Sequence, residues 1–202
     1  MTRGMSTHTP KVIVLAGANG VGKTTAAPRL LRDTLGLVEF VNADTIARGL
    51  AGFDPDAAAL EAGTIMFDRI RQLGVQRHSF AFETTLASRS LAPWIAELLQ
   101  AGYEFQLVFL WLPSPDLAVQ RVADRVRFGG HNVSEATVRR RYERGLQNFF
   151  HLYQPMATAW RMYDNTDAGN MQLIAEGQGA AVTAVWDGTL WDSIQGEYRH
   201  GD

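Results

Sequence analysis

A short glycine-rich motif near the start of the chain constrains its fold more than any other feature. Residues 17–24 read GANGVGKT, a complete G-x-x-x-x-G-K-[ST] sequence, and they follow the apolar, β-branched run KVIVLA of residues 11–16. A glycine-rich turn between a buried strand and a helix directs several backbone N–H groups, and the positive end of the helix dipole, at one point. The motif therefore predicts a phosphate-binding loop on a parallel α/β sheet.

The residues of this loop have predicted roles in holding a nucleotide. The glycines supply positive φ angles or positions with little room for a side chain. Lys23 would reach the β- and γ-phosphates as a point charge, and the Thr24 hydroxyl would ligate Mg²⁺. The alternative is a glycine-rich turn that contains a lysine by chance. The predicted nucleotide-binding residues here are Gly17, Ala18, Asn19, Gly20, Val21, Gly22, Lys23, Thr24 and Thr25.

Composition favours one domain and narrows the class of partner. The 202 residues are 46% hydrophobic and 20% charged, so they can bury one sizeable core, and we expect a single domain over residues 1–202. A formal charge of −2 gives no electrostatic reason to expect nucleic acid as the main partner. The lack of cysteine excludes disulfides and thiolate zinc sites. No apolar run of bilayer length and no signal peptide is recognisable, so we expect a cytoplasmic protein without a membrane partner.

Strand-like and helix-like segments alternate along the chain, which indicates parallel βαβ units. Strands are expected at residues 11–16, 38–41, 79–82 and 105–112, with weaker ones at 160–163 and 172–175. Helices are expected at about 22–35, 55–73 and 91–100, and two more begin at Pro115 and Ser134. The C-terminal segment with Trp186 and Trp191 is predicted to cover the core.

Polar residues follow the second and third predicted strands. In a parallel sheet, ligands bind at the carboxyl ends of the strands. Asn42 and Asp44 follow the second predicted strand, and Glu83, Thr84 and Thr85 follow the third. We predict that they converge on one site, where Asp44 accepts the proton of a substrate hydroxyl. The alternatives are that Asp44 caps a helix and that Glu83 is the buried partner of an arginine.

A basic region lies in the second half of the chain. Between residues 121 and 144, seven arginines stand against three acidic residues, a local excess of four positive charges in a net negative chain. The two helices that carry them are joined by the GGHN turn of residues 129–132, and we predict that they form a lid over about 116–145. Arginine forks bind phosphate oxygens, so a basic lid, Lys23 and a carboxylate base together fit phosphoryl transfer. The alternative is a solvated helix face with Glu135 and Glu143 as partners of the arginines.

At these residues the chain resembles the zeta-toxin family of P-loop kinases, in its short chromosomal branch. The segments that carry the resemblance span about residues 11–176 and read GANGVGKT, FVNADTIA, FAFETTL, FLWLPSPDLAVQRVADRV, GGHNVSEATVRRRYERGLQNFF and YDNT. The resemblance implies an α/β fold of the P-loop NTPase type, a three-layer sandwich with a parallel five-stranded sheet like that of shikimate and nucleotide kinases, and a helical lid. It also implies an ATP-dependent kinase acting on the 3′-hydroxyl of a UDP-sugar such as UDP-N-acetylglucosamine.

The resemblance further implies ATP and Mg²⁺ as cofactors, Glu83 as a ligand of the substrate hydroxyl, and an antitoxin protein as a partner. The predicted catalytic residues are Asp44, Lys23, Arg127 and Arg140, Arg125 is predicted to bind ATP, and the predicted substrate-binding residues are Asn42, Asp44, Glu83, Thr84, Thr85 and His131. Two other functions stay open. One is a kinase for another small hydroxylated metabolite, such as a sugar acid or a nucleoside, and the other is a nucleotide-dependent switch that hydrolyses slowly.

Overall fold

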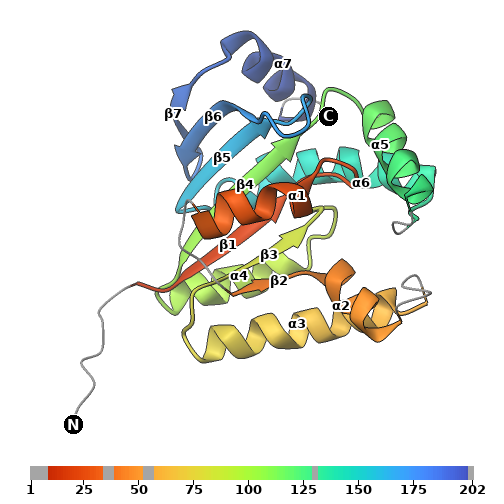
Figure 1. Ribbon diagram of the computed structural model, residues 1–202. Coiled ribbons are helices and arrows are strands. Elements are labelled where there is room, and N and C mark those ends of the chain that lie inside the picture. The colour runs from red at the N-terminus through yellow and green to blue at the C-terminus, as the bar shows by residue number, and fades with distance from the viewer. Residues whose placement is uncertain (1–8, 34–38, 52–56, 129–131, 200–202) are drawn as a thin grey trace.

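A seven-stranded sheet with helices on both faces forms the body of the protein (Figure 1). The computed structural model describes residues 9–33, 39–51, 57–128 and 132–199. The strands lie in the order β2-β3-β1-β4-β5-β6-β7; the first five are parallel, and β6 and β7 are antiparallel. Their bounds are β1 Lys11–Ala16, β2 Phe40–Val41, β3 Phe80–Thr84, β4 Glu104–Trp111, β5 Ala159–Asp164, β6 Gln172–Gln178 and β7 Ala181–Val185.

The helices connect the strands and are extended by two π-helical segments. Their bounds are α1 Lys23–Ala27, α2 Ala43–Leu50, α3 Ala59–Val75, α4 Leu91–Gln100, α5 Pro115–Arg127, α6 Glu135–Asn148 and α7 Gly188–Tyr198, with π-helical η1 Pro28–Asp33 after α1 and η2 Phe149–Tyr153 after α6. The change from α1 to η1 falls at Pro28, which has no N–H to donate to the preceding turn. Among the described residues, no helix combines the length and apolar character needed to cross a bilayer.

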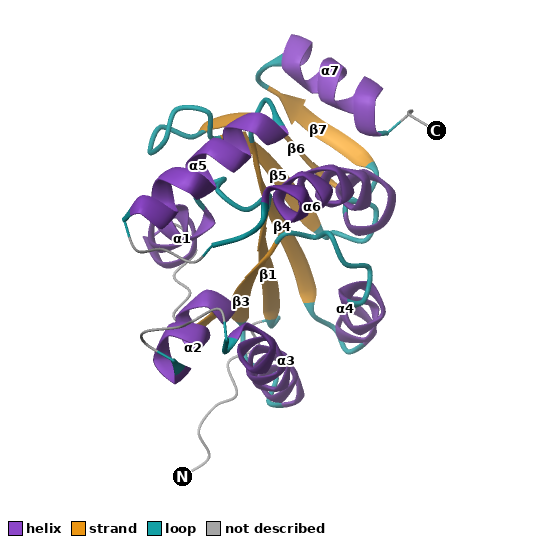
Figure 2. Cartoon of the chain, turned by 90° about the vertical axis from the view of Figure 1, so that its right-hand side faces the viewer, coloured by secondary structure: helices purple, strands orange, loops and turns teal. Residues whose placement is uncertain are grey.

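The direction of each crossover explains which face a helix covers. The connection from β1 to β2 runs one way across the sheet, whereas those from β3 to β4 and from β4 to β5 run the other way. Right-handed crossovers therefore place α1 on one face and α4 and α6 on the opposite face. Figure 2 shows this arrangement, with α5 on the same side as α1.

The predicted parallel sheet of five strands is confirmed for β2-β3-β1-β4-β5, and the hairpin of β6 and β7 adds two strands to it. The sequence pattern missed β7 because its residues are mostly exposed and show no buried face. It included α2 only in the alternative that Asp44 caps a helix, and it ended β3 too early, since Glu83 and Thr84 belong to that strand. The predicted helix boundaries near Gly36 and at Pro55, and the start of a strand at Val38, lie outside the described residues.

Aromatic side chains form two clusters in the core, one beside β3 and one beside β5. Near β3, the rings of Phe80 and Phe82 each lie 6.1 Å from that of Trp94 on α4. Near β5, Trp191 of α7 stacks on Trp160 at 5.4 Å and lies 5.7 Å from Phe150. The C-terminal helix therefore covers the core through Trp191, which is 3% exposed, whereas Trp186 is 57% exposed.

This difference makes a matched pair for a stability test. Trp191→Ala should lower the free energy of unfolding by about 3 kcal/mol or more, because it removes a stacked and fully packed ring. Trp186→Ala should change it by less than about 1 kcal/mol, because most of that ring is already in water. Urea denaturation followed by circular dichroism measures both values, and equal losses would contradict the assignment of α7 to the core.

Candidate active site

The phosphate-binding loop connects β1 to α1 with the backbone shape that its glycines predict. Gly17, Gly20 and Gly22 have φ angles of 135°, 80° and 93°, which residues other than glycine rarely adopt. The loop also lies close to α5, since a Cβ atom on Gly20 would come within 2.6 Å of the Ala118 carbonyl oxygen. Both observations confirm that this segment needs glycine.

Lys23 folds back over the loop. Its Nζ donates hydrogen bonds of 2.9 and 3.0 Å to the carbonyl oxygens of Gly17 and Ala18. Burial lowers the pKa of Lys23, the carboxylates of Glu83 and Asp44 oppose that shift, and Arg125 and Arg141 add to it. The ammonium group is thus desolvated and held by neutral oxygens, and an arriving phosphate anion would stabilise its charge.

Glu83 lies next to Thr24 at the carboxyl end of β3. The Thr24 hydroxyl donates to Glu83 Oε1 at 3.1 Å, and the Asn42 amide nitrogen donates to the same oxygen. Burial raises the pKa of Glu83 and the Asp44 carboxylate adds to this rise, whereas Lys23 and the two hydrogen bonds oppose it. Within the described part of the chain, the partners of Glu83 are a hydroxyl, an amide and a lysine, and not the arginine that one alternative proposed.

Asn42, and not Asp44, caps α2. The Asn42 side-chain oxygen accepts a 2.9 Å hydrogen bond from the Thr45 backbone N–H, while its nitrogen holds Glu83. Asn42 is only 4% exposed and supports Glu83 and the start of α2, and its predicted contact with substrate stays a prediction. Asp44 is therefore not needed for capping, and its side chain is available for chemistry.

The predicted base and the predicted ATP-binding arginine lie close together. Arg125 Nη1 on α5 is 3.8 Å from Asp44 Oδ2 on α2, and both side chains are partly exposed. They border a cavity of about 460 Å³, a volume that suits a small-molecule ligand. Its described lining residues are Asn19, Gly20, Gly22, Lys23, Thr24, Thr25, Ala43, Asp44, Ala47, Arg48, Ala59, Glu83, Arg121 and Arg125.

The arginines of α5 divide between two faces of the helix. Arg121 and Arg125 are four residues apart and both line the cavity. Arg127 is about 200° further around the helix from Arg125. Its side chain is 77% exposed and bonds to Asp124 at 3.2 Å. Arg127 therefore lies on a solvated helix face, as the alternative interpretation expected. The predicted catalytic role of Arg127 stays a prediction.

A similar division holds on α6. Arg141 Nη1 donates to the side-chain oxygen of Asn19 in the loop at 3.2 Å, and burial lowers the pKa of Arg141. Arg140 is exposed, and Arg139 pairs with Glu135 and Asp116. The structure thus brings Arg121, Arg125 and Arg141 beside the loop in place of Arg127 and Arg140, whose phosphate contacts stay predictions.

The remaining predicted residues fall outside the cavity lining or outside the described chain. Thr84 uses its hydroxyl oxygen to accept the Leu86 backbone N–H at 3.1 Å, and Thr85 follows it in the same turn. Ala18 and Val21 are 7% and 1% exposed, so they contribute backbone groups to the loop. His131 lies outside the described residues.

The sequence profile of the AAA-domain family matches residues 12–152, more than half of the chain. The chain belongs to this family. The matched region runs from β1 to η2 and so includes the loop, Asp44, Glu83 and the arginines of α5 and α6. It is also similar to a Haemophilus influenzae protein described only as uncharacterized, with 26% identity over 132 residues, 65% of this chain and 92% of that protein.

Solved structures share the fold. A chain of the AvrRxo1-ORF1:AvrRxo1-ORF2 complex gives a TM-score of 0.71 at 16% identity over 93% of this chain and 64% of that chain. A chain of the PezAT chromosomal toxin–antitoxin system of Streptococcus pneumoniae gives 0.65 at 16% identity over 100% of this chain and 83% of that chain. The protein thus spans less than two thirds of the AvrRxo1 chain. It has the P-loop NTPase fold predicted from its sequence.

The half-buried Glu83 carboxyl predicts a pH-dependent stability. Because burial raises its pKa above 4.5, the folded protein keeps a proton over a pH range in which the unfolded chain has lost it. The free energy of unfolding therefore falls as pH rises through that range. Glu83→Gln does not titrate, so its stability relative to wild type should increase from about pH 4.5 to about pH 8. Urea midpoints at both pH values measure this, and a difference that stays constant or decreases would contradict the account.

Proposed function

We propose that the protein is an ATP-dependent kinase that transfers the γ-phosphoryl group to a hydroxyl of an anionic small molecule, with a nucleotide sugar such as UDP-N-acetylglucosamine as the leading candidate. The observation that carries the proposal is that Asp44 borders the same cavity as the phosphate-binding loop. A carboxylate in this position can accept the proton of an alcohol that attacks the phosphate, whereas a switch protein needs a group that orients a water molecule for hydrolysis. The alternative of a slow nucleotide-dependent switch is less well supported for this reason.

The loop side of the cavity fits a triphosphate with its metal. Lys23, Arg121 and Arg125 supply positive charge there, and Arg141 approaches from α6 through Asn19. The Thr24 hydroxyl and the Glu83 carboxylate are oxygen ligands of the kind that Mg²⁺ prefers, and they already lie 3.1 Å apart. Thr24 and Glu83 would hold Mg²⁺, which would supply positive charge beside the phosphates.

Asp44 is the proposed base. It would accept the proton that the acceptor hydroxyl loses as its oxygen bonds to the γ-phosphorus and the bond from that phosphorus to the β,γ-bridging oxygen breaks. Lys23, the α5 arginines Arg121 and Arg125, and Arg141 of α6 would stabilise the charge that the leaving ADP gains. Arg125, whose Nη1 lies 3.8 Å from Asp44 Oδ2, would contact both the carboxylate and the transferred group.

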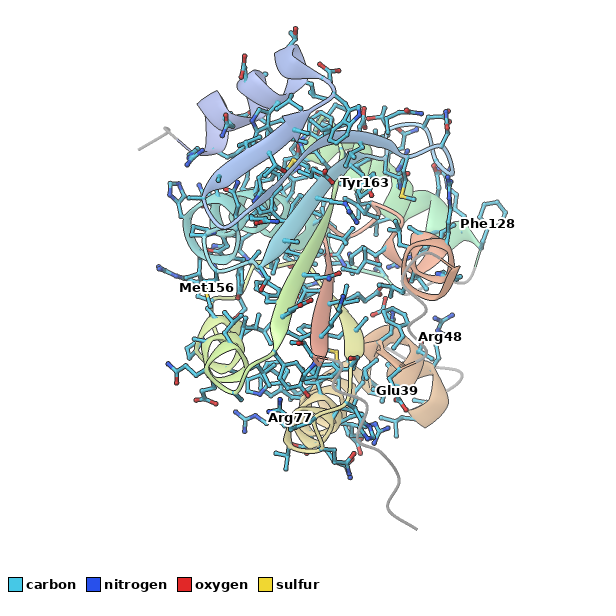
Figure 3. The ribbon with its side chains drawn as sticks, turned by 90° about the vertical axis from the view of Figure 1, so that its left-hand side faces the viewer. Glu39, Arg48, Arg77, Phe128, Met156 and Tyr163 are labelled. Atoms are coloured by element: carbon cyan, nitrogen blue, oxygen red, sulfur yellow. The ribbon has the colours of Figure 1, made fainter. Side chains whose placement is uncertain are left out.

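The acceptor side of the cavity favours an anionic substrate. Three small residues on α2 and α3, Ala43, Ala47 and Ala59, leave room beside Asp44. Arg48 lies one helical turn beyond Asp44 and lines the same cavity. It extends from α2 on the side of the molecule where α1 and Phe128 lie (Figure 3). Arginine forks bind phosphate and carboxylate groups, so a nucleotide sugar or a sugar acid fits better than a neutral nucleoside.

The zeta-toxin resemblance and the fold shared with a PezAT chain support the same reaction class. Another similar structure is that of an AvrRxo1-ORF1:-ORF2 complex with ATP. An antitoxin protein as partner is part of this proposal, since PezAT is a toxin–antitoxin system.

Asp44→Asn tests the proposed base. The amide keeps the size of the side chain but cannot accept the proton, so product formation from UDP-N-acetylglucosamine should fall by about a hundredfold or more. The affinity for ATP should stay within about threefold of wild type. Mass spectrometry measures the product, and calorimetry measures the affinity.

Lys23→Ala is the control for this test, because it should reduce both transfer and ATP affinity by removing the charge in the loop. An Asp44→Asn variant that turns over normally would remove Asp44 as the base. A variant that loses ATP affinity would instead assign Asp44 to the nucleotide–metal site.

Arg48→Ala tests the charge of the acceptor. We expect its KM for an anionic acceptor to rise about tenfold, the loss of one charge-assisted contact, with the KM for ATP unchanged. Arg144→Ala removes an exposed arginine from α6 and should leave both constants unchanged. Steady-state kinetics with each substrate varied in turn gives these values, and equal effects of the two variants would argue against an anion site at Arg48.

A further inference from the structure

Asn165 follows β5 and contacts the phosphate-binding loop from two strands away. Its side-chain nitrogen Nδ2 donates a 2.6 Å hydrogen bond to the carbonyl oxygen of Val21. Strand β4 lies between β5 and β1, so this bond crosses the end of β4 (Figure 1). Asn165 is 4% exposed and belongs to the YDNT segment of residues 163–166, which has no role in the phosphoryl transfer proposed above.

The position of Asn165 is fixed by its own backbone. Its N–H donates to the Trp111 carbonyl at the end of β4, at 3.1 Å. Arg121 of α5 donates to the carbonyl oxygens of Asn165 and Thr166 at 3.0 and 2.7 Å. The side chain therefore projects toward the loop from a backbone held by both β4 and α5.

The bond to Val21 sets the orientation of one peptide group in the loop. No cis peptide occurs among the described residues, so the C=O of Val21 and the N–H of Gly22 point in opposite directions. With the carbonyl directed at Asn165, the Gly22 N–H is directed away from Asn165. A carbonyl oxygen can only accept, so the amide nitrogen of Asn165 must be the atom that faces it.

Gly22 makes this orientation depend on a partner. Its φ of 93° and the absence of a side chain leave the backbone free to rotate this peptide, so local sterics alone do not select one orientation. A Cβ on Gly22 would lie 2.8 Å from Asn165 Nδ2, which shows how closely the two residues pack. The Asn165 hydrogen bond is therefore the interaction on this side that selects the orientation.

We propose that Asn165 is a positioning residue for nucleotide binding, which holds the Val21 carbonyl so that the Gly22 N–H stays directed at the β-phosphate. The inference rests on the proposed function, because it needs a nucleotide phosphate in the loop. Preorganised N–H donors bind a phosphate without the cost of orienting them, and loops of this type use backbone N–H groups for that purpose.

Asn165→Leu tests the inference, because leucine has a similar size and cannot donate. Calorimetry with Mg·ADP should show binding about tenfold weaker than in wild type. The matched control is Asn148→Leu on α6, which removes a 2.7 Å hydrogen bond from an asparagine amide to the carbonyl oxygen of Leu86, a residue outside the phosphate-binding loop. The Asn148→Leu variant should bind ADP with wild-type affinity even if the midpoint of its thermal unfolding is lower.

Asn165→Asp adds a readout that a purely structural role would not change. A protonated carboxyl group can donate to Val21, whereas a carboxylate cannot, so ADP affinity relative to wild type should recover as the pH is lowered from about 8 to about 5.5. The inference is overturned if Asn165→Leu binds ADP as wild type does, if the Asn148 control weakens binding equally, or if the Asp variant shows no such recovery. If the wild-type protein does not bind Mg·ADP at all, the proposed function is overturned as well. If the wild-type protein binds Mg·ADP and Asn165→Leu binds it equally tightly, only this inference is overturned.

Discussion

The burial of β1 between β3 and β4 is the constraint on which the site depends. Residues Val12–Ala16 are at most 1% exposed, and their parallel register places Leu15 beside Glu83 and Ala16 beside both Thr84 and Phe109. The chain turns into the phosphate-binding loop at the carboxyl end of β1. The parallel strands β3 and β4 end at the same edge of the sheet. The phosphate-binding loop, Glu83 and helix α5 meet because of this register.

The charges at that edge are held in an environment that favours an anionic ligand. Burial lowers the pKa of Lys23 and raises that of Glu83, so each pays a desolvation cost that the other only partly offsets. Asp44 and Arg125 face each other at the cavity with partly exposed side chains. A phosphate chain with its cation would satisfy Lys23 and Glu83 together, which links the electrostatics of the site to its proposed chemistry.

The sequence predicted the parts of the protein that local chemistry determines. The loop, the five parallel strands and the convergence of Asp44 with Glu83 follow from motif and hydrophobic pattern, and the structure bears them out. The sequence could not separate the arginines of α5, because Arg125 and Arg127 differ only by their position around a helix whose facing partner the sequence does not reveal. Asn42 and Asn165 act through tertiary contacts 41 and 144 positions away, which no local pattern encodes.

The central claim is that phosphoryl transfer in this cavity goes to an anionic hydroxyl compound and not to water. The most direct test measures ADP and phosphorylated product together, with Mg·ATP alone and with UDP-N-acetylglucosamine, a sugar acid or a neutral nucleoside added. The account predicts that ADP forms at an appreciable rate only with an anionic acceptor, in equal amount to the phosphorylated product. Hydrolysis of ATP at the same rate without any acceptor, with no phosphorylated product detected, would contradict it.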